Sequence, residues 1–329
     1  MKGAGLYFGR ALTGLWSRGG RNGRLAVLIY HRVLPGVDPL YPGEPDQDTF
    51  RWQMAAVAAT CNVLPLTEAV ERLTTHSLPP RAVAITFDDG YADNLTQALP
   101  VLHEFELPAT VFVASGFIDG GIMWNDTVIE TLRRIPAGEI DLSPVDLEPA
   151  RVDGIDTQRS LAQVIIDRLK YLPLDERKRR ADELAGHLGV NLPDDLMLTT
   201  SQLKMLAAGG IEIGAHTVNH PILSRLSAGQ AREEIVGSRS QLEDILRQPV
   251  GLFAYPNGRP GKDYGDEHAK MLRVAGFSAA VSTAWAVNGA ASDRYQLARI
   301  NSWDKTPLRF IMRVADAFRR GLLADCPNT

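Results

Sequence analysis

Short apolar runs alternate with amphipathic stretches along most of the chain. The apolar runs are rich in Val, Ile, Ala and Phe and end abruptly at polar or turn residues, which is typical of buried strands. We expect strands at residues 25–30, 82–87, 109–114, 210–215, 250–255, 277–281 and 295–301. The stretches between them have helical periodicity, and we expect helices at residues 50–59, 67–73, 93–105, 201–208, 227–246, 267–275 and 306–323. This alternation predicts an α/β fold built from βα units.

The pattern changes between about residue 120 and residue 197, where the chain is charged, helical in character and poor in strand signals. Its helical segments are expected at residues 126–135, 158–169 and 175–188. We interpret this stretch as a helical insertion between two βα units of a domain that covers residues 25–329. Because barrel active sites are built from loops at the carboxyl ends of strands, we expect the insertion to cover the mouth of such a site.

Composition narrows the class of protein. Of the 329 residues, 45% are hydrophobic and 22% are charged, as in an ordinary globular domain. The formal net charge of −4 argues against a nucleic-acid-binding surface. The two cysteines, Cys61 and Cys326, form no C-x-x-C pair, so no disulfide framework is expected and a reducing compartment suits the chain.

Residues 1–24 form a basic, partly apolar segment with helical spacing. Arg10 interrupts its apolar run, so it lacks the pattern of a signal peptide, and no segment approaches the ~20 apolar residues of a membrane span. Two interpretations stay open for this helical extension: an interfacial helix on an anionic membrane surface, or a helix packed on the domain. We expect the second, in a cytoplasmic protein with peripheral membrane contact as the alternative.

Two adjacent carboxylates, Asp88 and Asp89, follow the expected strand at residues 82–87 and precede Gly90. Neighbouring carboxylates repel each other and cost desolvation energy, so a strand end rarely carries two without a cation or a proton-transfer role. The plainer interpretation is a turn in which Asp caps the next helix and Gly takes positive φ.

His216 and His220 follow the expected strand at residues 210–215 with i, i+4 spacing. Such a pair also occurs on ordinary surface faces, so by itself it indicates a metal only weakly. Two histidines and one carboxylate together make a metal site with open coordination positions. The remaining aspartate can then act as a base beside the metal, which predicts metal-assisted hydrolysis.

Chemistry-bearing residues thus follow four separate strands: His31, the two aspartates, His216 and Asn257. In a barrel of parallel strands the carboxyl ends meet at one rim. We therefore expect these side chains to share a single pocket.

These motifs resemble the polysaccharide deacetylase family, the NodB-homology domain of carbohydrate esterase family 4. Residues 86–90 (Thr-Phe-Asp-Asp-Gly) match its first motif, and residues 216–220 (His-Thr-Val-Asn-His) match its second, His-Ser/Thr-x-x-His. The similarity runs from about residue 25 to about residue 302, apart from the insertion. It implies a distorted (β/α) barrel of about seven strands and a divalent metal, usually Zn²⁺, with Co²⁺, Ni²⁺ or Mn²⁺ as alternatives.

The resemblance also assigns roles to residues. It implies that Asp89, His216 and His220 bind the metal and that Asp88 is the general base. The backbone N–H of Asn257, in the third motif, is then placed to stabilise the oxyanion.

Two motifs depart from the family. It typically has Arg-x-Pro-Tyr/Phe-Gly where this chain has Ala-Tyr-Pro-Asn-Gly at residues 254–258, so Ala254 replaces the arginine that usually steadies the catalytic aspartate. The Leu-x-His motif, which usually supplies the general acid, aligns with residues 297–299 and ends in Arg299. We hypothesise that Arg299 orients Asp88 in place of the missing arginine, or contacts substrate.

His31 is our candidate for the missing general acid. Tyr30 and His31 after the first strand resemble the exopolysaccharide-modifying branch of the family, in which an N-terminal histidine lies at the active site. The alternative is a histidine that caps the end of the strand by hydrogen bonds.

Candidate substrate-binding residues besides Arg299 are Tyr255 and Pro256 in the third motif, and Trp124 and Trp285 as platforms for sugar rings. Tryptophans at such positions are more often part of a core.

We therefore expect a metal-dependent hydrolase that removes N-acetyl groups from amino sugars of a cell-surface glycan or its lipid-linked precursor. Two enzymatic alternatives are an O-acetyl esterase and a hydrolase of small cyclic amides or ureides on the same barrel. A non-catalytic glycan-binding member of the family is the alternative from another class.

Overall fold

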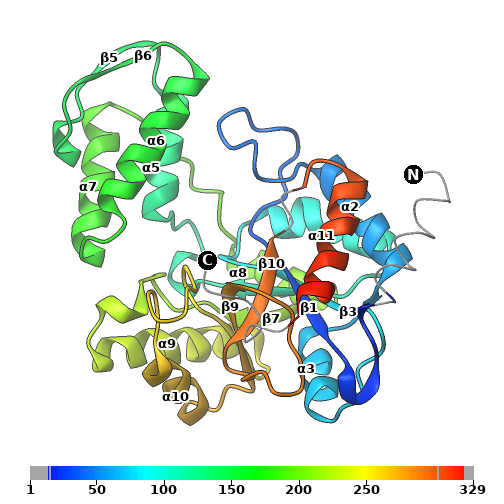
Figure 1. The fold of residues 1–329 in the computed structure, drawn as a ribbon. Coiled ribbons are helices and arrows are strands. Elements are labelled where there is room, and N and C mark those ends of the chain that lie inside the picture. Colours follow the sequence, from blue (N-terminus) through cyan, green and yellow to red (C-terminus); the bar gives the residue numbers. More distant parts are fainter. Residues whose placement is uncertain (1–13, 15, 302–303, 322–329) are drawn as a thin grey trace.

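The computed structural model describes residue 14, residues 16–301 and residues 304–321. Seven parallel strands close into a barrel, because β1 pairs with both β10 and β3 (Figure 1). In spatial order they are β1 (Leu25–Tyr30), β10 (Leu297–Asn301), β9 (Ala279–Trp285), β8 (Leu252–Ala254), β7 (Glu212–Ala215), β4 (Thr110–Val113) and β3 (Ala82–Phe87). Each overlaps a segment expected to be a strand, and the prediction of an α/β barrel of about seven strands is confirmed. A two-residue strand, β2 (Asn62–Val63), pairs with β3 outside the barrel.

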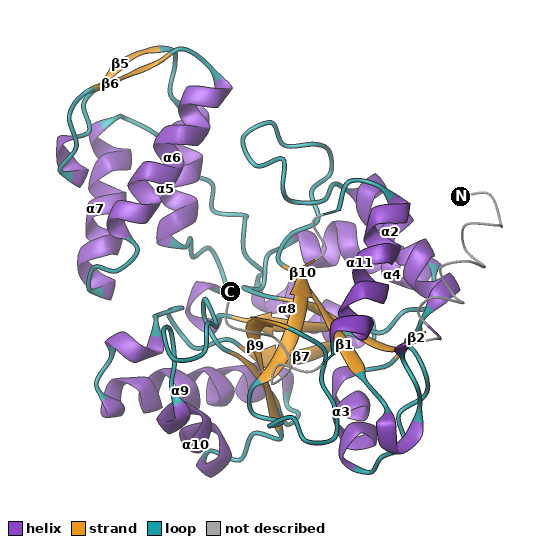
Figure 2. Cartoon of the chain, viewed as in Figure 1, coloured by secondary structure: helices purple, strands orange, loops and turns teal. Residues whose placement is uncertain are grey.

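Ten α-helices lie wholly within the described residues, and most cover the outside of the barrel (Figure 2). They are α2 (Gln47–Thr60), α3 (Leu66–Thr74), α4 (Leu99–Glu104), α5 (Trp124–Arg134), α6 (Ile155–Leu169), α7 (Leu174–His187), α8 (Thr200–Ala208), α9 (Ala228–Leu246), α10 (Asp266–Val274) and α11 (Pro307–Arg320). The side chains of Thr199, Ser227 and Thr306 cap the first turns of α8, α9 and α11. Such caps satisfy backbone N–H groups that have no partner inside the helix.

The strands read as continuous apolar runs because both of their faces are buried. In β1 and β3 all six residues are buried. One set of side chains, which includes Val27, Ala84 and Ala254, packs inside the barrel, and the alternate set packs against the surrounding helices.

Residues between β4 and α8 form a separate group of elements with a hydrophobic core of its own. Helices α5, α6 and α7 pack together there, apart from the barrel helices (Figure 1). The group also contains a short antiparallel pair, β5 (Gly138–Ile140) and β6 (Ala150–Val152), which we did not expect. Strands of three residues leave too short a pattern to detect.

Residues 1–13 and 15 of the basic N-terminal extension lie outside the described residues, so its membrane contact stays a prediction. The adjoining part of the chain is fixed to the barrel by the hydrogen bonds from Gly20 N–H to the Leu78 carbonyl and from Arg81 N–H to the Ser17 hydroxyl, both 2.8 Å. Within the described ranges, no helix has the length and apolar character needed to cross a membrane.

Candidate metal centre and active site

The end of β3 presents two carboxylates in different directions. The Asp88 N–H donates to the Tyr30 carbonyl at 2.9 Å, which continues the pairing with β1, and the chain then turns sharply at Asp89, whose φ is 77°. Gly90 follows with φ 88°, and a Cβ at this position would lie 2.9 Å from a methyl carbon of Val113. The motif therefore needs glycine here, and a strained Asp89 is typical of a functional turn.

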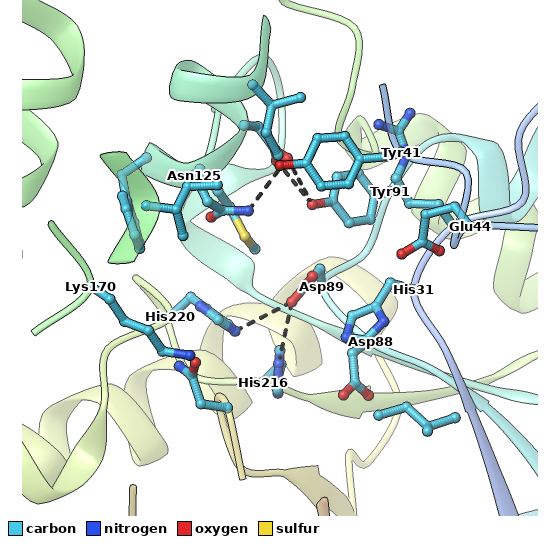
Figure 3. A pocket seen from close by; sticks show the side chains of 18 of the residues that line it. His31, Tyr41, Glu44, Asp88, Asp89, Tyr91, Asn125, Lys170, His216 and His220 are labelled. Carbon is cyan, nitrogen blue, oxygen red and sulfur yellow. Dashed lines mark hydrogen bonds and ion pairs between the residues drawn. The ribbon is translucent and has the colours of Figure 1, made fainter. Parts of the chain in front are cut away.

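The end of β7 presents the two histidines. The His216 N–H donates to the Val113 carbonyl at 3.0 Å, and the next turn contains two more left-handed residues, Thr217 with φ 65° and His220 with φ 52°. The His220 N–H donates to the Thr217 hydroxyl at 3.1 Å, which closes this turn. Both imidazole rings face Asp89 as a result (Figure 3).

Asp89, His216 and His220 converge on one point. Each histidine Nε2 lies 3.4 Å from Asp89 Oδ1, and the three candidate ligand atoms all lie within 4.8 Å of one another. The His216 Nδ1–H donates to the Ala254 carbonyl at 2.7 Å, so in the neutral ring Nε2 offers its lone pair toward Asp89. Asp89 Oδ1 is buried without a hydrogen-bond partner in the described part of the chain. A lone pair facing an unpartnered carboxylate oxygen fits a divalent cation between them.

The charges at two of these residues, Asp89 and His220, agree with that interpretation. Burial raises the pKa of Asp89, but His216 and His220 outweigh this effect and the carboxyl stays ionised. Burial lowers the pKa of His220 to about 3, so this ring is neutral and its lone pair is free. At His216 burial lowers the pKa, but contact with Asp89 raises it above its ordinary value.

Asp88 faces away from this triad into an ion pair with Arg299. Arg299 Nη1 and Nη2 donate to Asp88 Oδ1 and Oδ2, both at 2.7 Å, and Arg299 Nε donates to the Ser282 carbonyl at 2.8 Å. Burial opposes the charged form of Asp88, but Arg299 outweighs it and holds the pKa of that carboxyl below its ordinary value. Arg299 comes from β10 inside the barrel and does not line the cavity, so it contacts Asp88 rather than open space.

His31 and Asn257 reach the same cavity from the ends of β1 and β8. The His31 ring points toward the two aspartates (Figure 3), and its carbonyl accepts from Asn94 Nδ2 at 2.9 Å, which fixes the loop after β1. Asn257 has φ 57° and, among the described residues, its N–H has no hydrogen-bond acceptor.

The cavity above the triad has a volume of about 660 Å³ and lies between the barrel rim and the inserted helices. Trp124, at the start of α5, lines it. Tyr255, Pro256 and Trp285, which we also proposed as substrate contacts, do not line this cavity. Tyr255 is fully buried and stacks on Tyr264, with ring centroids 3.6 Å apart, and Pro256 is also buried. Trp285 lies outside the cavity, with the Arg320 guanidinium over its ring.

Several residues that line the cavity were not expected from the sequence. Asp126 of α5 is buried and accepts a hydrogen bond of 2.9 Å from the Tyr91 hydroxyl, and Lys170 and Arg177 flank the triad on the side of the insertion. Arg32 stacks over Tyr91 at 4.7 Å. The positions of Asp126, Lys170 and Arg177 in the cavity depend on how the insertion packs against the barrel, and no local sequence pattern encodes that packing.

The sequence matches the polysaccharide deacetylase family over residues 75–158 and 173–280, more than half of its length. The chain belongs to this family. The matched ranges include both aspartates of the first motif and both histidines of the second, whereas His31 and Arg299 lie outside them.

Three relatives of this family member are distant from it in sequence. YxkH of Bacillus subtilis, whose name assigns it provisionally to the same family, is 22% identical over 289 residues, or 88% of this chain and 75% of YxkH. The Streptococcus pyogenes deacetylase PplD, solved in complex with acetate, aligns with a TM-score of 0.62 at 19% identity and covers 89% of this chain and 99% of its own. IcaB from Ammonifex degensii aligns with a TM-score of 0.57 at 21% identity, and the alignment covers 92% of this chain and 99% of IcaB. At these identities the structures establish a shared fold.

Proposed function

We propose that this member of the polysaccharide deacetylase family is a metal-dependent hydrolase that removes N-acetyl groups from amino sugars of a cell-surface glycan or its lipid-linked precursor. The observation that carries the proposal is the pairing of two sites in one cavity: the Asp89–His216–His220 triad, and beside it a carboxylate, Asp88, held in its charged form by Arg299. A base that stays ionised next to a metal site is what hydrolysis of an amide requires.

In this proposal each residue of the site has a separate role in the reaction. A divalent ion, which we propose to be Zn²⁺, would polarise the acetamide carbonyl and activate water when bound to the triad. Asp88 accepts the proton of the attacking water. The free N–H of Asn257 donates to the developing oxyanion, and His31 gives a proton to the departing amine.

Related proteins support the substrate class. PplD is described as a deacetylase and was solved with acetate, the product that this reaction would release. The Tyr30–His31 pair supports the exopolysaccharide-modifying branch of the family.

The proposal is tested by acetate release from metal-stripped protein with and without added Zn²⁺. Substrates should include N-acetylglucosamine oligomers, O-acetylated sugars and small cyclic amides. We expect Zn²⁺-dependent acetate release from the N-acetylated oligomers, and a loss of about 10²-fold or more in kcat for Asp88→Asn with the metal retained. Preferential hydrolysis of O-acetyl or cyclic substrates would favour those alternatives, and glycan binding without turnover would favour a non-catalytic member.

A further inference from the structure

A second hollow of about 670 Å³ lies next to the metal cavity and shares Lys170 and Arg177 with it. It runs between the inserted helices and the loop from His220 to α9, past the exposed ring of Tyr171. We call this hollow the outer groove. Because the two spaces share lining residues, a chain-like substrate seated at the triad could continue into the outer groove.

Three cations gather around Tyr171, which lines the outer groove, and two of them, Lys170 and Arg225, line the groove themselves. Lys170 Nζ, Arg225 Cζ and Lys262 Nζ lie 6.0, 5.4 and 5.2 Å from the centroid of the Tyr171 ring. Within the described residues, none of these three cations has a carboxylate within 4.0 Å, whereas neighbouring Lys178, like most arginines of the inserted helices, forms an ion pair. Cations held together without counter-ions repel one another and make a local positive potential.

Arg177 adds a buried charge at the junction of the two spaces. It is only 3% exposed, it donates to the carbonyls of His220 and Lys170 at 3.0 and 3.3 Å, and its Cζ lies 5.3 Å from the Trp124 ring. Its Nε is buried without a partner in the described part of the chain, and no carboxylate pairs with the guanidinium there. A buried cation that lacks a counter-ion is costly, so the site is better satisfied when an anion is bound nearby.

Within the described residues, the acidic side chains that line the groove form no ion pair with its cations. The charge of Glu234 favours the ionised form of Arg177 from beyond ion-pair distance, and its Oε2 accepts hydrogen bonds from the N–H groups of Val218 and Asn219, both at 2.8 Å. Asp175 and Glu233 also line the groove and are exposed to solvent, and Glu44 lies on the side of the metal cavity opposite Lys170 (Figure 3).

We propose that the outer groove binds an anionic part of the substrate, a carboxylate or phosphate attached to the N-acetylated glycan, while Tyr171 packs against a sugar ring. The inference rests on the proposed deacetylase function and specifies its substrate as an acidic glycan or a phosphate-linked precursor. Arg177 and Lys170 face the end of the bound anion that lies next to the triad. Arg225 and Lys262 face the end that lies farther from the triad.

Three N-acetylated probes of different charge test the proposal: a neutral N-acetylglucosamine tetramer, a hyaluronan tetrasaccharide that carries sugar carboxylates, and UDP-N-acetylglucosamine, which carries a diphosphate. Binding is measured by calorimetry with zinc-loaded Asp88→Asn protein, which should not consume the probes. We expect at least one anionic probe to bind about 10-fold or more tighter than the neutral tetramer at low salt, with the advantage shrinking as salt screens the charges. A preference for carboxylate indicates an acidic polymer, and a preference for diphosphate indicates a phosphate-linked precursor.

The matched variants are Arg225→Gln, which lines the groove, combined with Lys262→Gln, which lies beside it at Tyr171, and Lys204→Gln on the exposed face of α8 as a control outside both spaces. Both groove side chains are exposed, so these changes should leave the fold intact. The groove double variant should lose most of the preference for the anionic probe, whereas the control should keep it. Equal binding of neutral and anionic probes, or an unchanged preference in the groove variant, would overturn the inference. Since binding is read without turnover, that result is separate from a failure to release acetate, which would contradict the proposed function instead.

Discussion

Replacing Arg299 with methionine removes the cation that faces Asp88 while keeping a long side chain inside the barrel. The pair is joined by two contacts of 2.7 Å, and its side chains are 0% and 4% exposed. Removing one partner of such a buried pair costs about 3–5 kcal/mol, because the other charge is left without compensation. At about 2 °C per kcal/mol for a chain of this size, the melting temperature should fall by roughly 6–10 °C.

The matched control is Arg179→Met. Arg179 pairs with Glu183 at 2.6 Å, but these side chains are 56% and 48% exposed. An exposed pair of this kind contributes roughly 0.5 kcal/mol or less, despite its short distance. The comparison therefore separates burial from contact distance.

The assay is urea unfolding of metal-free protein followed by circular dichroism, for Arg299→Met, Asp88→Asn and the double variant. Removing both charges leaves no uncompensated ion, so the double variant should be more stable than the sum of the single effects predicts, by about 2 kcal/mol or more. An additive cycle, or an Arg299→Met cost no larger than that of Arg179→Met, would refute the assignment of a stabilising buried pair.

Three further outcomes follow from the site. Asp89→Ala and His216→Ala should each lower the bound metal from about one ion per chain to a small fraction of that, as measured by atomic emission, and full retention in both would contradict the triad. His31→Ala should reduce kcat on N-acetyl sugars by about 10-fold or more and spare activated esters, whose leaving groups need little protonation, so equal losses on both would argue against a general acid. Burial raises the pKa of Asp126 to about 7 despite the nearby Arg32. The folded protein thus keeps a proton on Asp126 that the unfolded chain loses near pH 4, and the contribution of this carboxyl to the free energy of unfolding should fall as the pH rises from about 4 to 7, by up to about 4 kcal/mol. Asp126→Asn should flatten this part of the stability curve of metal-free protein, and parallel curves for the two proteins would count against it.

The barrel could be predicted from the sequence because its strands are buried on both faces. A run such as residues 82–87 is then apolar almost throughout, which marks it as a strand. The helical periodicity of the segments between such runs is a separate pattern and marks the helices. Three-residue strands such as β5 are too short to show such a pattern. Local periodicity also does not determine the order of the strands in the barrel or how the insertion packs against it.

The convergence of Asp89, His216 and His220 could be predicted because its chemistry is local: two carboxylates at one strand end and two histidines at another. Which further residues line the cavity could not be predicted, because that depends on which way a side chain points. Tyr255 belongs to the third motif but packs under the rim against Tyr264, whereas Arg177, in the first turn of the charged helix α7, is carried into the cavity by the packing of α7 on α5.

The exchange between Ala254 and Arg299 shows what such a site requires. Where this chain has Ala254, family members typically have the arginine that steadies the catalytic aspartate, and Ala254 is a small, fully buried residue inside the barrel. The guanidinium instead arrives from β10, across the barrel interior, and meets both oxygens of Asp88. Electrostatics fixes where the positive charge must lie, but not which strand supplies it. Because Arg299 then occupies the position of the usual histidine, we propose that the proton donor is His31 at the end of β1, the histidine that faces Asp88 and is not a metal ligand in our assignment.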